Sequence, residues 1–332
     1  MVPLSILDLA PIVEGSDAAQ ALANSLDLAR HAEALGYRRY WLAEHHNMDG
    51  VASSATAVLI AFVAAGTKTI RVGSGGVMLP NHAPLVIAEQ FGTLATLYPG
   101  RIDLGLGRAP GTDRATMRAL RRHLDANDEE GFPRDVMELQ AYLAAPRDGD
   151  PAALVRAIPG IGTRVPIWLL GSSLYSAQLA AHLGMPFAFA SHFAPDYLLH
   201  ALEVYRSTYK PSREWPEPHA MVGVNVVCAD TDDEAAWHYT SIQQRFLAMQ
   251  RGVRGPLPRP IDPAVYATMG TPQEQAGAAR MLAASAVGSP ATVADLLGQI
   301  LEQTRADELI VAGAIHDHAA RKRSYELLAR VA

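Results

Sequence analysis

The sequence is dominated by one repeated pattern, in which a short apolar run is followed by an amphipathic or alanine-rich helical segment. Apolar runs of this kind, bounded by Gly, Pro and polar residues, are typical of strands in a parallel sheet that helices cover. The predicted strands are Ser5–Ile12, Tyr40–Ala43, Ile70–Val77, Ile102–Leu106, Pro166–Leu170, Phe187–Ala190, Val222–Cys228 and Glu308–Ala312. The main predicted helices are Asp17–Leu35, Ser54–Ala65, Pro84–Leu97, Thr112–Leu124, Glu129–Ala144, Ser173–Leu183 and His318–Ala329.

Eight strands that alternate with helices predict an α/β fold, and we favour a closed (β/α)8 barrel, the TIM-barrel architecture, over a doubly wound open sheet. All 332 residues are expected to form one domain. The segment Arg251–Ala286 breaks the alternation, because a Gly- and Pro-rich stretch precedes a helical stretch between the seventh and eighth predicted strands. Long insertions in barrels usually belong to the face that carries the chemistry. This insertion is either a lid or a rigid connection.

Composition excludes several classes of function. The formal net charge is −6 and no basic stripe is present, which argues against a nucleic-acid partner. The first residues, MVPLSILDLAPIVEG, lack both a charged leader and a long apolar stretch, so we expect a cytoplasmic protein without a membrane anchor. No metal site is predicted, since His82 and His192 offer no recognisable ligand spacing.

Small residues after the fifth predicted strand form a candidate anion site. Gly171, Ser172 and Ser173, with Ser176, run directly into a helix. Free backbone amides at a helix start, together with hydroxyl donors, suit a phosphate. An ordinary serine N-cap is the alternative interpretation. Arg108, at the end of the fourth predicted strand, favours phosphate because a guanidinium matches phosphate oxygens.

His45 follows the second predicted strand and should project into the mouth of the barrel, where it could transfer a proton near neutral pH. A structural histidine bonded to Glu44 and a metal ligand are the competing interpretations. An apolar substrate pocket or ordinary core packing would each account for four further side chains, Trp41, Met78, Phe193 and Tyr197.

Several longer motifs, in this order and at these intervals, resemble the bacterial luciferase-like family of flavin-dependent monooxygenases. The resemblance covers most of the chain. It rests on YWLAEHHN (40–47), VGSGGVMLPNHAP (72–84), GRIDLGLGR (100–108), IWLLGSS (167–173), LGMPFAFA (183–190), ADELIV (306–311) and SYELLA (324–329). It implies a (β/α)8 barrel of the luciferase type with an insertion near the seventh strand.

The resemblance also implies a cofactor, reduced FMN (FMNH2) or, in other branches, the deazaflavin F420. His45 matches the histidine near the reactive edge of the flavin, with Glu44 beside it. Gly75-Gly76 matches a bulge that often holds a cis peptide bond under the flavin ring, and an ordinary glycine bulge is the alternative. The residues that would hold the FMN phosphate are Arg108, Gly171, Ser172, Ser173 and Ser176.

The function implied is oxidation of a small organic substrate by O2 and FMNH2, which a separate flavin reductase supplies. Family members are commonly dimers, and the segment Ser54–Ala65 is compatible with a homodimer contact or, equally, with packing on the barrel. Gly107 stands where luciferase has a cysteine, so light emission is not expected. An F420-dependent hydride-transfer enzyme and a non-catalytic flavin-binding protein are the alternatives. A hydrolase that uses Glu44 would lack a second suitable carboxylate.

Overall fold

The computed structural model describes residues 2–109, 113–120, 128–145 and 155–331, and within them the sheet closes into a barrel. The ring runs β1-β2-β3-β4-β5-β6-β7-β9 with every pairing parallel, and β9 returns to β1 through the pair Leu4 and Leu309. The (β/α)8 barrel is therefore confirmed and the open sheet was the wrong alternative. The ring strands are β1 (Leu4–Asp8), β2 (Arg39–Leu42), β3 (Arg71–Met78), β4 (Ile102–Gly107), β5 (Ile167–Gly171), β6 (Phe187–Phe189), β7 (Ala220–Cys228) and β9 (Glu308–Ala312).

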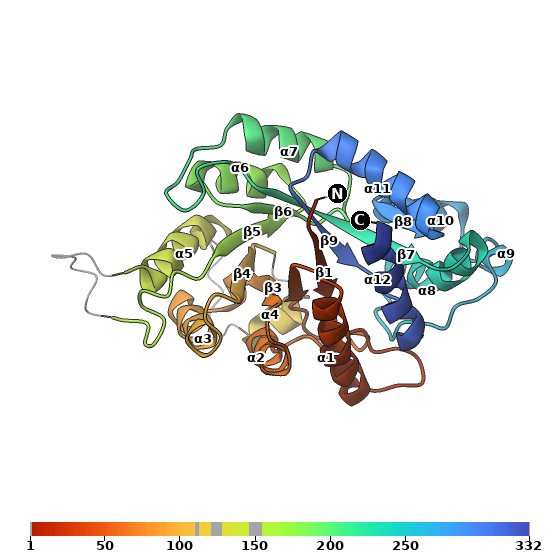
Figure 1. The fold of residues 1–332 in the computed structure, drawn as a ribbon, viewed down its shortest axis with the longest axis horizontal. Helices are drawn as coiled ribbons and strands as arrows, with labels where there is room; N and C mark the ends of the chain where they lie inside the picture. Colours follow the sequence, from red (N-terminus) through yellow and green to blue (C-terminus); the bar gives the residue numbers. More distant parts are fainter. Residues whose placement is uncertain (1, 110–112, 121–127, 146–154, 332) are drawn as a thin grey trace.

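Helices surround the ring, as Figure 1 shows. They are α1 (Ala18–Ala34), α2 (Thr56–Gly66), α3 (Pro84–Leu97), α4 (Arg114–Leu120), α5 (Asp128–Leu143), α6 (Leu174–Leu183), α7 (Leu198–Ser207), α8 (Asp232–Gln250), α9 (Pro263–Tyr266), α10 (Pro272–Met281), α11 (Pro290–Thr304) and α12 (His318–Val331). Local signals set their ends: the side chain of Asp17 caps α1, and Gly184 ends α6 in the left-handed conformation. Part of the predicted helix Thr112–Leu124 lies outside the described residues.

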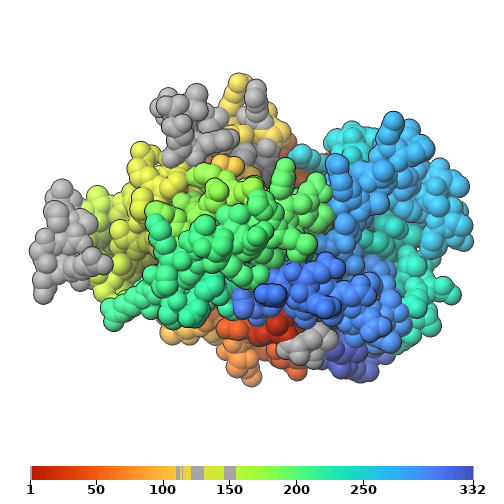
Figure 2. All heavy atoms as spheres, turned by 90° about the horizontal axis from the view of Figure 1, so that it is seen from above, coloured from red at the N-terminus to blue at the C-terminus, as the bar shows by residue number. Residues whose placement is uncertain are grey.

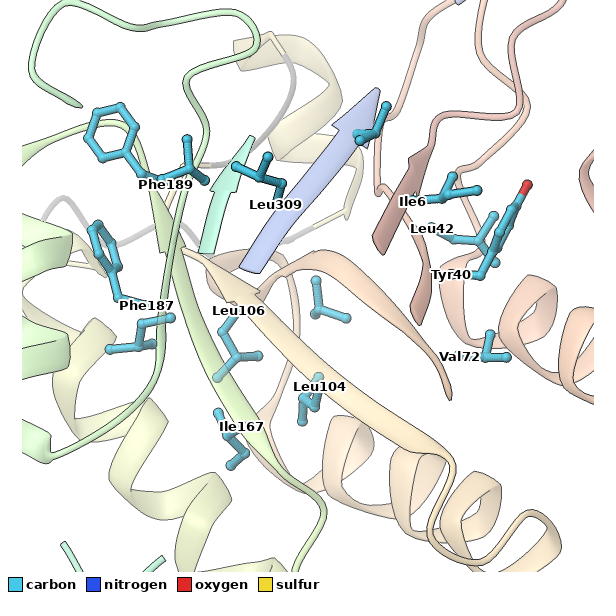
Figure 3. Packing of buried hydrophobic residues seen from close by; sticks show 14 of the residues in the cluster. Ile6, Tyr40, Leu42, Val72, Leu104, Leu106, Ile167, Phe187, Phe189 and Leu309 are labelled. Carbon is cyan, nitrogen blue, oxygen red and sulfur yellow. The ribbon is translucent and has the colours of Figure 1, made fainter. Parts of the chain in front are cut away.

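Alternating side chains divide the core into two layers. Ile6, Tyr40 and Phe187 belong to the large outer cluster between the strands and the helices, whereas their neighbours Leu7 and Trp41 belong to a smaller cluster inside the ring. This division follows from the period of two along a strand. Figure 3 shows the outer layer, where Phe187 and Phe189 of β6 lie on the same face of their strand.

A buried ion network closes the amino-terminal end of the barrel. The guanidinium of Arg39 donates to Asp103 at 2.7 Å and to Glu308 at 2.9 Å, and it lies over the ring of Trp168 at 4.8 Å. Ser5 also donates to Glu308. Buried charges of this kind are tolerated when they are paired and hydrogen-bonded. Because these groups fill one end of the ring, the opposite end is left for a ligand.

The insertion contains a strand that the sequence pattern did not predict. Ser285–Gly288 forms β8, which pairs with the second half of β7, from Asn225 to Cys228. The helix predicted to continue to Ala286 ends at Met281. Four side chains join α8 to the segment around α10 in one apolar cluster, Ile242, Phe246, Ala278 and Leu282. The insertion therefore pairs with β7 and packs against α8. Whether it opens as a lid or is a rigid connection is not tested.

The helices also contact one another around the ring. Figure 2 shows α6 and α7 (green) beside α11 (blue), and the side chain of Arg206 on α7 donates to the carbonyl oxygen of Thr304 at 2.8 Å. In the part of the chain that the structure describes, no helix is both long and apolar enough to cross a membrane.

Candidate active site

A cavity of about 460 Å³ lies at the carboxyl ends of the barrel strands. Active sites of such barrels are found at this face. The structure brings together in its wall eight of the nine site residues that the sequence predicted, namely His45, Gly75, Gly76, Arg108, Gly171, Ser172, Ser173 and Ser176. The ring topology gathers these residues, because they lie in or just after four different strands of one ring.

The backbone of β3 approaches the cavity at Gly75-Gly76. The register between β3 and β4 shifts between Ser74 and Val77, and the peptide bond between the two glycines is cis. A Cβ on Gly75 would lie 2.6 Å from a methyl carbon of Leu7, and one on Gly76 would lie 2.7 Å from the carbonyl oxygen of Gly105. The clash at Gly76 is with backbone, so only glycine fits there, whereas at Gly75 the side chain of Leu7 would have to move. The bulge expected at these glycines is present, and its peptide bond, which the sequence left open, is cis.

The start of α6 has the features of an anion site. Ser173 is the N-cap residue, yet its side chain makes no capping hydrogen bond, so the simple N-cap interpretation does not account for its hydroxyl group. Ser176 is buried at 4% exposure. A Cβ on Gly171 would lie only 2.2 Å from the Oγ of Ser176, so the glycine makes room for this serine. Free amides and hydroxyl groups at a helix start fit a phosphate.

Arg108 adds a positive charge beside this helix start. Its guanidinium lies over the ring of Tyr175 on α6 with the carbon 4.1 Å from the ring centre. The stacking holds the cation against α6, in the cavity wall that Ser173 and Ser176 also line. The donor set therefore fits the phosphate end of FMN, as the resemblance implies.

Two histidines lie in the cavity wall. His45 follows β2, and its backbone amide donates to the carbonyl oxygen of Ser53 at 3.0 Å. His192 follows β6; burial first and then the nearby His45 lower its pKa to about 4. His192 is thus neutral at neutral pH. The sequence analysis considered His192 only as a metal ligand, because nothing in the sequence indicates that it lies close to His45.

Glu44 does not share the cavity with its neighbour. Its carboxylate accepts hydrogen bonds from Nε2 of His82 at 2.8 Å and Nε2 of His46 at 3.0 Å, and the side chain is buried outside the cavity wall. Burial alone would raise the pKa of Glu44, but the hydrogen bonds and charges of His82 and His46 outweigh it and lower that pKa. In the described residues, no group of three or more histidine, cysteine or acidic side chains could hold a metal ion.

The cavity also has a wall that the sequence did not predict. Of the four side chains left open between pocket lining and core packing, Trp41, Met78 and Phe193 line the cavity, whereas Tyr197 is 57% exposed and fits neither interpretation. The unpredicted wall comes from α8. Its cavity-lining residues, spaced three and four apart on one helical face, are Ile242, Arg245, Phe246 and Met249.

Comparisons with known proteins identify the family of the chain. The family model "Luciferase-like monooxygenase" matches residues 2–308, and the chain belongs to that family. A "Luciferase-like monooxygenase" of Escherichia coli (strain K12) is 58% identical over 326 residues, which cover 98% of this chain and 96% of the relative. Membership of this family supports an oxidoreductase.

Solved structures show the same fold. The crystal structure of apo-MsnO8 has a TM-score of 0.86 and 38% identity, and the match covers 100% of this chain and 98% of that one. The oxygenating constituent of 3,6-diketocamphane monooxygenase from Pseudomonas putida, in complex with FMN, has a TM-score of 0.72 and 20% identity, with 99% and 97% covered.

Proposed function

We propose that this chain is an FMN-dependent monooxygenase that uses FMNH2 and O2 to oxidise a small organic substrate. The observation that carries the proposal is the anion site at the start of α6, with Arg108 stacked beside it, on the rim of a cavity that reaches the Gly75-Gly76 backbone. The FMN bound in the diketocamphane enzyme supports the same cofactor here. A flavin supplies the electrons that activate oxygen.

The protein's part in this proposal is binding, orientation and proton management. Arg108, Ser173 and Ser176, with the backbone around Gly171 and Ser172, would hold the phosphate. The Gly75-Gly76 backbone would face the ring, because no side chain intervenes there. Apolar side chains such as Trp41, Phe189 and Phe246 make up much of the remaining wall and exclude water.

His45 is the residue that we propose to move the proton. Its side chain lines the cavity, and an imidazole nitrogen can accept or release a proton near neutral pH. Neutral His192 beside it would avoid a second positive charge next to a protonated His45. Glu44 would act indirectly, since its hydrogen bond holds His46, the residue that follows His45, and a second one joins it to His82.

Anaerobic titration of the full chain with FMNH2 and with reduced F420, followed by air, tests the proposal. We expect FMNH2 to bind, and a panel of small organic compounds to yield a product that carries ¹⁸O from ¹⁸O2. Binding of F420 alone, without oxygen consumption, would instead place the chain among hydride-transfer enzymes. Binding of FMNH2 with no oxygen-dependent product from any compound would favour a flavin-binding protein.

Two partners complete the proposal. A separate flavin reductase would supply FMNH2, and activity that requires an added reductase would support this. A second copy of the chain would cover exposed apolar side chains on α2 and α3, which include Val58 (67% exposed) and Leu97 (62% exposed). Light scattering at several protein concentrations measures the oligomeric state, and a monomer at all of them contradicts the homodimer. The cytoplasmic location stays a prediction.

A further inference from the structure

Arg245 on α8 lines the cavity, and no acidic side chain among the described residues forms an ion pair with it. Burial lowers its pKa, and within the described ranges no charged or hydrogen-bonding partner offsets that burial. Arg321 lines the same cavity but is neutralised, because it donates to Asp8 at 2.8 Å and to the carbonyl oxygen of Gly313 at 2.7 Å. Arg39 is likewise paired with two carboxylates. An unpaired cation costs stability, so its retention in a cavity points to a ligand.

The phosphate of FMN does not account for this charge, because Arg245 lies on another wall. Arg108 follows β4 and is held against α6. Arg245 belongs to the helix that follows β7, and β6 separates β7 from β5 in the ring. The phosphate site therefore occupies the β4–β5 side of the mouth, and Arg245 the β7 side.

The cavity wall is positive as a whole, although the chain is acidic. Among the described lining residues there are three arginines, two histidines and no aspartate or glutamate, whereas the net charge of the chain is −6. Asp8 neutralises Arg321, and the proposed FMN phosphate would neutralise Arg108. Arg245 is then the one lining arginine of the described residues whose charge is not balanced, so its guanidinium could bind an anionic group other than the cofactor phosphate.

The surroundings of Arg245 indicate the shape of that anion. Ile242, Phe246 and Met249 lie on the same helical face and offer an apolar surface next to a single guanidinium. A guanidinium binds a planar carboxylate through two parallel hydrogen bonds. We infer that Arg245 binds the carboxylate of an amphipathic acid, the substrate class of the proposed monooxygenase, with the apolar body of that acid along α8. This inference rests on the proposed function for the reaction, but the binding can be measured without it.

Matched ligands test the inference directly. Octanoate and its uncharged analogue octanamide would be titrated calorimetrically into the full chain, with and without FMN. The proteins are the wild type, Arg245→Gln, Arg245→Lys and the control Arg254→Gln, which removes an exposed arginine outside the cavity. We expect octanoate to bind the wild type at least about tenfold more tightly than octanamide, as charge-assisted hydrogen bonds imply.

In Arg245→Gln the octanoate affinity should fall by about 10- to 100-fold while the octanamide affinity stays unchanged. Arg245→Lys should keep part of the preference, and Arg254→Gln all of it. Equal binding of the two ligands to the wild type, an equal loss of both in Arg245→Gln, or no octanoate binding at millimolar concentration would each overturn the inference. A loss of FMN affinity alone would assign Arg245 to the cofactor site and leave the proposed function standing. A preference for octanoate in a protein that does not bind FMN would support the carboxylate site at Arg245 and contradict the proposed function.

Discussion

Replacing Arg108 by glutamine should weaken FMN binding without changing the affinity for riboflavin, which lacks the phosphate. The guanidinium is fixed over Tyr175 at 4.1 Å, beside the start of α6, so its hydrogen bonds to a phosphate need little reordering. A hydrogen bond to a charged group contributes about 1.5–3 kcal/mol. Since about 1.4 kcal/mol corresponds to a tenfold change, the FMN affinity should fall by about 10- to 140-fold. The lost stacking on Tyr175 affects free and bound protein alike, and it largely cancels.

Quenching of flavin fluorescence measures both affinities in the same buffer. Arg213→Gln is the matched control, because it removes an exposed arginine that does not line the cavity. Added salt should weaken FMN binding to the wild type more than to Arg108→Gln, since screening acts on the phosphate contact. Equal losses for FMN and riboflavin, or an unchanged FMN affinity, would refute the placement of the phosphate beside Arg108.

Three further predictions concern proton transfer, pH and packing. His45→Ala should keep FMN binding but lose about 10²–10⁴ in product formation, and unchanged coupled turnover would remove His45 from the mechanism. Folded His192 stays neutral until a pH of about 4, whereas the unfolded chain takes up the proton near 6.5, so stability is lost as the pH falls. Urea titrations at pH 7 and 5 should show about 2 kcal/mol more loss in the wild type than in His192→Gln, and equal losses would contradict the lowered pKa. Gly92→Ala on α3 should destabilise by about 1–3 kcal/mol, since its Cβ would lie 2.0 Å from the Cα of Gly160. Gly298→Ala on α11, where the added Cβ would meet no atom within 4 Å, should stabilise the protein by about 0.5–1 kcal/mol. Urea unfolding measures both variants, and a change in the free energy of unfolding of the same sign in both would contradict the close contact of Gly92 with Gly160.

The barrel could be predicted because each ring strand is a short apolar run that helices flank. The strand β8 could not, since Ser285–Gly288 is short, small in its side chains and only half buried. Alanine-rich sequence before it also favours a helix, and the pairing with β7 overrides that preference. The ring strands are thus defined locally, whereas β8 depends on contacts that are distant in the sequence.

The same contrast applies to the site. Residues that directly follow strands, such as His45 and Arg108, could be placed because all the strands end at one face. Glu44 was grouped with His45, but successive side chains of an extended segment point in opposite directions, and Glu44 is buried against His46 and His82. Arg245 was missed because the packing of α8 on β7, β8 and α10, which are distant in the sequence or unpredicted, brings that helix to the cavity. The spacing of residues 242, 245, 246 and 249 could have indicated that they share one face of a helix.

The wall formed by α8 has a consequence for how such an enzyme can change. The proposed phosphate and ring contacts come from β3, β4 and the start of α6, whereas the apolar face with Arg245 comes from a single helix near the insertion. Substitutions at Ile242, Arg245, Phe246 or Met249 would therefore alter which molecule is oxidised without touching the groups that hold the cofactor. A library confined to these four positions would be a compact way to redirect the catalyst to new substrates.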